Sequence, residues 1–226
     1  MQEIPVIVVL TQSMDSNLEF YNNVHDLCYS CSDVLRVLAF PYDCPLGTIK
    51  AFGLKELVSK TSEKMPEAHK AAFIAAQKID LGIKEKQSYK IVSAAAAAAA
   101  TTGATPIPFS DVAILAPIQV GMLASISLAM GLDLTRSFLS TLVSSAAGVA
   151  GATYAGKAIV AGLIKLIPGA GTIIGGVISG ATAAALTTTM GIAYIKAIKY
   201  LIENNLEISP NSISEAFVNE LKNSTL

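Results

Sequence analysis

The stretch Ile173–Ile195, which reads IIGGVISGATAAALTTTMGIAYI, has no charged side chain and is long enough to cross a bilayer as a single helix. It lies in a longer apolar segment, 91–195, in which only five of 105 residues are charged: Asp111, Asp133, Arg136, Lys157 and Lys165. A soluble surface needs more polar side chains than such a segment offers. We therefore predict an apolar helical domain over 91–200, built of helical hairpins or a bundle and associated with a membrane.

Small residues in this segment are spaced for close contact between helices. Gly171 and Gly175 form one GxxxG pair, and Gly176 and Gly180 form another. In lipid, such residues let helix backbones approach closely. Helices there associate through this close packing, because the hydrophobic effect does not drive helix association inside a bilayer. The same spacing is typical of a soluble bundle with an alanine-rich core, so a soluble helical module that self-associates through these faces remains an alternative.

The formal charge of the 226-residue chain is −1, from 16 Lys and Arg against 17 Asp and Glu, which gives no general attraction to nucleic acid. Basic residues instead flank the apolar segment on both sides: Lys84, Lys86 and Lys90 before it, and Lys196 and Lys199 after it. The positive-inside rule then predicts that both termini lie in the cytoplasm, with two spans as the simplest arrangement. Lys157 and Lys165, near the connection between those spans, oppose this bias and favour a peripheral or soluble arrangement.

Residues 1–66 predict a small unit with the order β-α-β-α. Val6–Leu10 is a continuously apolar, β-branched run, and Val34–Phe40 is a second, mainly apolar run, as in strands buried on both faces of a parallel sheet. Helices are expected over 18–30 and 53–64. A sheet of only two parallel strands leaves both of its edges exposed, and such a small unit cannot cover both faces of the sheet. We therefore interpret the unit as one end of a larger, doubly wound α/β domain.

Several motifs of the apolar segment resemble one known family. In chain order they are Ala94–Ala100, Pro106–Asp111 (PIPFSD), Pro117–Met122 (PIQVGM), Lys165–Thr172 (KLIPGAGT) and Thr187–Gly191 (TTTMG). On these motifs, residues 88–200 are similar to the domain of unknown function family 697. Members of that family often follow a Ras-like GTPase domain, and others are inner-membrane proteins. The resemblance implies four parts: a C-terminal remnant of a Ras-like GTPase domain (1–66), a linking helix (67–90), the apolar helical domain (91–200) and a C-terminal tail (201–226).

The same resemblance assigns the residues after the first strand to a degenerate guanine-specificity loop. This loop is NKxD in Ras-like GTPases, and Thr11-Gln12-Ser13-Met14 stands at its position. Met14 therefore replaces the aspartate that bonds the base, and Asp15 comes one residue late. The resemblance implies a weak nucleotide-binding site at Thr11, Gln12 and Asp15, with no catalytic residue, and GTP as a cofactor only if the missing half of the domain is present.

A phosphate-binding loop of the form GxxxxGK[ST] has one near match in the chain, Gly151–Ala158 (GATYAGKA). It ends in alanine where a hydroxyl should bind Mg²⁺, and it lies inside an apolar helical run instead of following a strand. We interpret it as a helix-packing sequence. This chain alone is therefore not expected to hydrolyse GTP.

Two further sets of polar residues have a functional and a structural interpretation. His25, Cys28, Cys31 and Cys44 offer a candidate zinc site, but ligands three residues apart along one helix diverge, so small core thiols are favoured. Gln119 is expected either to hydrogen-bond to another helix or to line a cavity without a role.

These observations predict a membrane-associated helical module of a GTPase-family protein that anchors to or senses a membrane. The expected partners are a lipid membrane, a partner GTPase domain and a second copy of the chain, and not nucleic acid. The alternative is a truncated or split GTPase that hydrolyses GTP only when its missing N-terminal half is supplied.

Overall fold

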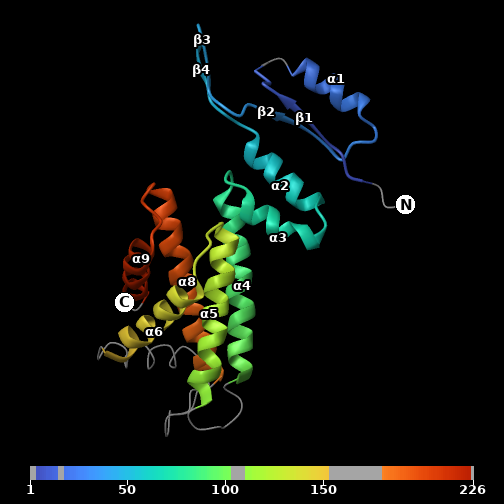
Figure 1. Cartoon of the computed structure of the whole chain (residues 1–226). Helices are drawn as coiled ribbons and strands as arrows, with labels where there is room; N and C mark the ends of the chain where they lie inside the picture. Colours follow the sequence, from blue (N-terminus) through green and yellow to red (C-terminus); the bar gives the residue numbers. More distant parts are fainter. Residues whose placement is uncertain (1–3, 15–17, 103–109, 153–179, 225–226) are drawn as a thin grey trace. The chain divides into compact units, whose positions relative to one another are not determined.

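The structure, a computed structural model of the chain, describes residues 4–14, 18–102, 110–152 and 180–224. It is mainly helical, with a small region of strands and helices toward the N-terminus, as the sequence predicted (Figure 1). The chain forms two compact units, Met1–Ile83 and Lys84–Leu226, which we call the N-terminal unit and the helical unit.

A pair of parallel strands organises the N-terminal unit. β1 (Ile7–Thr11) pairs with β2 (Asp33–Val37), from Ile7 opposite Asp33 to Thr11 opposite Val37, and α1 (Glu19–Leu27) lies between them in the chain. The predicted order of strand, helix and strand is confirmed, as is the parallel pairing. The expected burial on both faces is wrong for β1, because none of its residues is buried. Among the described residues, β1 has a neighbour on one edge only.

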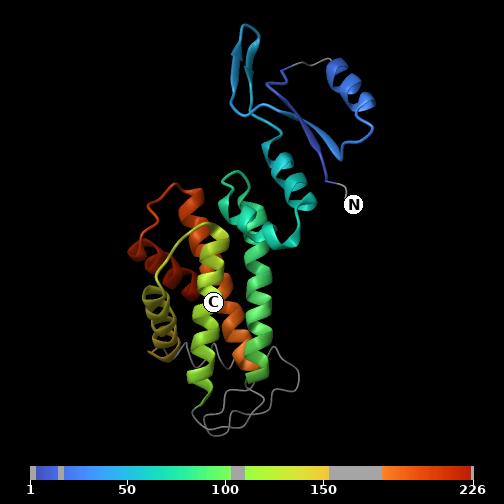
Figure 2. The ribbon, with the colours of Figure 1, turned by 45° about the vertical axis from the view of Figure 1, so that its right-hand side comes forward.

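A β-hairpin follows β2 in the chain. β3 (Tyr42–Cys44) and β4 (Gly47–Ile49) pair in antiparallel fashion and form a separate two-stranded ribbon (Figure 2). The turn between them needs the conformational freedom of Gly47, whose φ is 128°.

Helix α2 (Leu54–Lys64) packs on β2 through the buried side chain of Val58. It begins at Gly53, where φ is 82° and a Cβ would lie 2.0 Å from the carbonyl oxygen of Arg36. Only glycine fits at this position, because the atom in the way belongs to the backbone of β2. Lys60 also ties α2 to β2, since its Nζ lies 3.1 Å from Asp33 Oδ1.

The linking helix predicted over 67–90 is not one helix, because the chain breaks it into α3 (Glu67–Ala76) and α4 (Leu81–Thr102). Gln77 and Asp80 explain the break. Gln77 Oε1 accepts hydrogen bonds from two backbone N–H groups, those of residues 79 and 80, and Asp80 Oδ1 accepts from those of residues 82 and 83. These side chains satisfy the donors that a helix start leaves unpaired.

Three helices run side by side in the helical unit: α4, α5 (Ser110–Met130) and α8 (Gly180–Glu203) (Figures 1 and 2). A Cβ at Gly191 of α8 would lie 2.5 Å from Val92 Cγ2 and 3.0 Å from Met122 Sδ, so this glycine packs directly against α4 and α5. A Cβ at Gly180 would lie 2.2 Å from the carbonyl oxygen of Ala100. Gly180 therefore shows the close approach expected of the GxxxG pairs, while 171, 175 and 176 lie outside the described residues. Gly191, which was not among the expected glycines, packs closely as well.

Two more helices complete the unit, α6 (Arg136–Ala152) and α9 (Pro210–Asn223). Residues 201–226, expected as a tail, thus include a helix that packs on α8. Phe217 of α9 is fully buried and meets Tyr194 of α8 edge to face, with ring centroids 5.8 Å apart. A capping box of Ser209 and Ser212 begins α9.

Candidate functional site

The predicted loop lies at the carboxyl end of β1. The strand ends at Thr11, and Gln12 turns the chain with a φ of 53°. The backbone N–H of Ser13 then donates to the carbonyl oxygen of Val37, at 3.4 Å, which holds the loop beside the end of β2. Ligands of open α/β sheets bind outside the carboxyl ends of parallel strands, so this is the expected location for a binding site.

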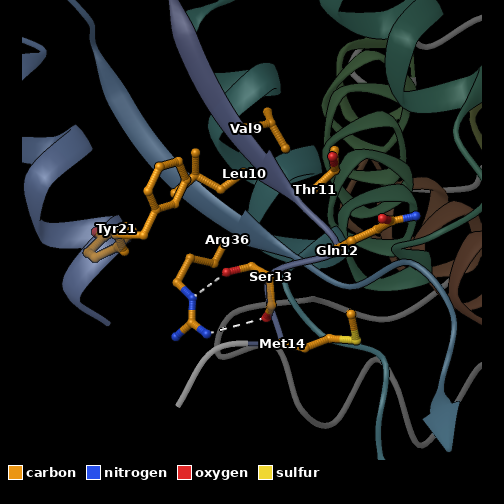
Figure 3. A pocket seen from close by; sticks show the side chains of 9 residues that line it. Val9, Leu10, Thr11, Gln12, Ser13, Met14, Tyr21 and Arg36 are labelled. Carbon is orange, nitrogen blue, oxygen red and sulfur yellow. Dashed lines mark hydrogen bonds between the residues drawn. The ribbon is translucent and has the colours of Figure 1, made fainter. Parts of the chain in front are cut away.

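Arg36 fixes the conformation of this loop (Figure 3). Its Nε donates to Ser13 Oγ at 2.8 Å, its Nη2 donates to the Ser13 carbonyl oxygen at 3.3 Å, and its guanidinium lies 5.6 Å from the centre of the Phe52 ring. Sequence reasoning missed both Ser13 and Arg36. The available signal was Arg36, the single charged residue of the run Val34–Phe40.

A pocket of about 610 Å³ opens at this loop. It is lined by the end of β1, the loop, α1 and β2: Val9, Leu10, Thr11, Gln12, Ser13, Met14, Phe20, Tyr21 and Arg36. Its volume falls in the range of small-molecule sites, which is roughly 300–1,000 Å³. Two aromatic rings, three hydroxyls, an amide and a guanidinium give it the means to hold a flat molecule with polar edges.

The structure brings Thr11 and Gln12 to this pocket, and Asp15 lies outside the described residues. Met14 lines the pocket at the position where a guanine-specific loop carries its aspartate. A thioether accepts hydrogen bonds only weakly, so Met14 does not replace a carboxylate in holding a base. Nucleotide binding at this loop stays a prediction.

The candidate zinc ligands do not come together among the residues that the structure describes. All three thiols are free, and two of them donate to nearby carbonyl oxygens: Cys31 Sγ to Cys28 at 3.1 Å, and Cys44 Sγ to Gly47 at 3.0 Å. The side chain of Cys28 also raises the pKa of the Cys31 thiol, which disfavours the thiolate that a metal would bind.

The near match to a phosphate-binding loop is described only at its first two residues. Gly151 and Ala152 end helix α6, and 153–158 lie outside the described residues. The described part of the motif is thus helical, whereas a phosphate-binding loop precedes its helix.

Polar groups inside the helical unit join its helices to one another. Gln119 Nε2 of α5 lies 3.5 Å from Thr187 Oγ1 of α8, which agrees with the expected interhelical hydrogen bond of Gln119. Ser127 Oγ and Tyr194 OH lie 2.8 Å apart, and the buried Lys84 Nζ donates to the carbonyl oxygen of Met130 at 3.1 Å. These contacts satisfy polar atoms that would otherwise be costly to bury.

Within the part of the chain that is described, one helix has the length and composition to cross a membrane. This is α8, Gly180–Glu203, with a mean hydropathy of 1.2 in its most apolar window. Inside the structure, 56% of that window is buried, and the core helix of a soluble bundle has the same properties. Helix α8 alone therefore gives weak support to membrane association.

Comparison with known proteins identifies the helical part of the chain. A curated relative, "Magnetosome membrane protein 22" of Magnetospirillum gryphiswaldense, is 31% identical over 99 residues. The match covers 44% of this chain and 51% of the relative, so the chain spans about half the length of the curated relative it matches. No solved structure matches. The model of the family described as a domain of unknown function (DUF697) matches residues 68–222, more than half of the chain, and the chain therefore belongs to this family.

Proposed function

We propose that this chain is a membrane-associated helical module of a GTPase-family protein, which anchors to or senses a membrane and does not hydrolyse GTP by itself. The observation that carries the proposal is helix α8, which is apolar and long enough to span a membrane. The similarity of the chain to "Magnetosome membrane protein 22" supports it. Helix α5 adds a second apolar stretch, Leu115–Met130.

The distribution of lysines supports an orientation for this module. Lys84, Lys86 and Lys90 lie in the first turns of α4, and Lys196 and Lys199 lie toward the end of α8. These turns are neighbours, because Lys199 Nζ lies 2.8 Å from Glu85 Oε2. The positive-inside rule places such a basic end in the cytoplasm, together with both termini.

Sedimentation of the expressed full chain tests this proposal. Cells are lysed without detergent, and the chain is followed in the pellet and supernatant of a high-speed spin before and after addition of a mild detergent. We expect the chain in the membrane pellet and its release by detergent. Recovery of a monodisperse chain in the first supernatant would overturn membrane association.

The second candidate function is a truncated or split GTPase that acts only with its missing half or with a partner GTPase domain. Two observations favour it: β1 has one unpaired edge among the described residues, and a pocket lies at its carboxyl end. Competition between GTP and ATP for a fluorescent GTP analogue tests this idea. Guanine-selective binding that is weakened in Gln12→Ala would support it, and equal competition by both nucleotides, or absence of binding, would count against it.

A further inference from the structure

The hairpin of β3 and β4 has one apolar and one polar face. Tyr42 pairs with Ile49, and Asp43 pairs with Thr48. Because side chains alternate across strands, Tyr42 and Ile49 share one face and Asp43 and Thr48 share the other. The Thr48 hydroxyl donates to Asp43 Oδ1 at 2.6 Å, so the only carboxylate of the hairpin is engaged on the polar face.

The tip and base of the hairpin expose large apolar side chains. Leu46, in the turn, is 100% exposed, and Phe40, just before β3, is 80% exposed. Tyr42 is 48% exposed on the apolar face. Single exposed apolar residues are ordinary on a protein surface, but here three large ones stand within seven residues of chain, at the base, on one strand and at the tip of the same hairpin, where an apolar partner would cover them.

We propose that this hairpin is a wedge that inserts Leu46, with Phe40 and Tyr42 behind it, into the interfacial region of a lipid bilayer. The proposal rests on the membrane association proposed above. Tyrosine suits the boundary between acyl chains and headgroups, because its ring is apolar and its hydroxyl can stay hydrated. Lys50, which directly follows β4, is exposed and makes no ion pair within the described residues, so it can meet anionic headgroups.

The small size of the wedge favours lipid over a protein partner. With exposed fractions of 100%, 80% and 48%, Leu46, Phe40 and Tyr42 together present roughly 340–570 Å² of apolar surface, since a large apolar or aromatic residue buries roughly 150–250 Å² when it is fully covered. A stable protein interface buries about 800 Å² on each partner. A bilayer requires no such minimum, because each inserted side chain contributes by its own area.

Tryptophan fluorescence tests the position of the tip directly. The chain contains no tryptophan, so Leu46→Trp in the full chain creates a reporter without background. Thr48→Trp, two residues away on the polar face, is the matched control. Each variant is mixed with vesicles of phosphatidylcholine and phosphatidylserine, with and without bromine on the acyl chains, after its helical content and thermal unfolding are compared with those of the parent.

We expect the emission of Leu46→Trp to shift to the blue with vesicles and to be quenched by brominated lipid more strongly than that of Thr48→Trp. Leu46→Asp should lower the ratio of lipid-buried to water-exposed tryptophan at position 40, in the Phe40→Trp variant, about ten- to one-hundred-fold, because it removes one inserted side chain. If the chain floats with the vesicles while Leu46→Trp remains in water, the wedge is refuted and membrane association stands. If the chain does not float, both proposals fail. A blue shift that occurs without lipid and resists bromine would mean that the tip is covered by protein, which also refutes the wedge.

Discussion

Gly191 gives the sharpest test of how the helical unit packs. A Cβ added there would lie 2.5 Å from Val92 Cγ2 and 3.0 Å from both Val92 Cγ1 and Met122 Sδ. Real Cβ atoms essentially never approach another heavy atom as closely as 2.5 Å, so the side chain of Val92 or one of the helices must shift in Gly191→Ala. Val92 cannot turn away easily, because a β-branched residue in a helix has one strongly preferred rotamer.

The magnitude follows from two opposing effects. Replacing glycine by alanine inside a helix stabilises it by about 1 kcal/mol, whereas overpacking a close-packed interior costs about 1–3 kcal/mol. Gly121 on α5 is the matched control, because a Cβ there would meet no heavy atom within 4 Å. Gly121→Ala should therefore gain the helix stabilisation without any cost of overpacking. Gly191→Ala gains the same stabilisation but also bears that cost, so it should be less stable than Gly121→Ala by about 1–3 kcal/mol.

Thermal unfolding of the two full-length variants, followed by the circular dichroism of the helices in one mild detergent, measures this difference. It corresponds to roughly 2–12 °C in Tm, since about 1 kcal/mol shifts Tm by about 2–4 °C in a chain of this size. Equal Tm values for the two variants would refute the direct contact of α8 with α4 and α5 at this level.

Three further predictions concern other contacts. Gln119→Leu or Thr187→Val alone should destabilise the helical unit by about 1–3 kcal/mol, because each substitution leaves the other polar group unpaired. In a double-mutant cycle followed by chemical unfolding, the double variant should recover part of this loss, and additive losses would contradict the hydrogen bond. Phe217→Ala should cost about 3–5 kcal/mol in the same assay, since its ring is fully buried, and a loss below about 1 kcal/mol would mean that α9 does not pack on α8. Hydrogen bonding to Asp33 raises the pKa of Lys60 above its ordinary 10.5, so the stabilisation by this pair is fully present below about pH 10.5 and is lost as pH rises through the higher folded-state pKa. Asp33→Asn should remove this alkaline dependence, measured by unfolding at neutral pH and at about pH 11, and an unchanged dependence would exclude the pair as its cause.

Local patterns in the sequence were sufficient to predict those strands and helices that depend mainly on their own residues. The apolar run at Val6–Leu10 became β1, and the helix expected over 53–64 became α2, one residue shorter at its start. The break between α3 and α4 was missed because Gln77 and Asp80 have no strong helix-breaking tendency on their own. They end and begin helices here only through hydrogen bonds to nearby N–H groups, which periodicity does not reveal.

Some residues of the candidate site could not be predicted, because contacts between distant parts of the chain bring them together. Thr11 and Gln12 were assigned from the resemblance to a guanine-specificity loop, and their role stays a prediction. Ser13 and Arg36 are 23 residues apart and meet only because β1 and β2 are parallel neighbours. Helix α9 was likewise not predicted, and only two of its residues, Ile213 and Phe217, one turn apart, are buried. The domain boundaries expected at residues 66, 90 and 200 stay predictions. In the structure, the boundary between the two compact units falls between Ile83 and Lys84.

Flotation of the purified full chain tests the central claim most directly. The chain is freed of detergent in the presence of phosphatidylcholine and phosphatidylserine vesicles and is placed at the bottom of a density gradient. Membrane association predicts that the chain rises with the vesicles and stays with them after washing at high salt. A chain that remains at the bottom as a soluble, folded monomer would contradict it.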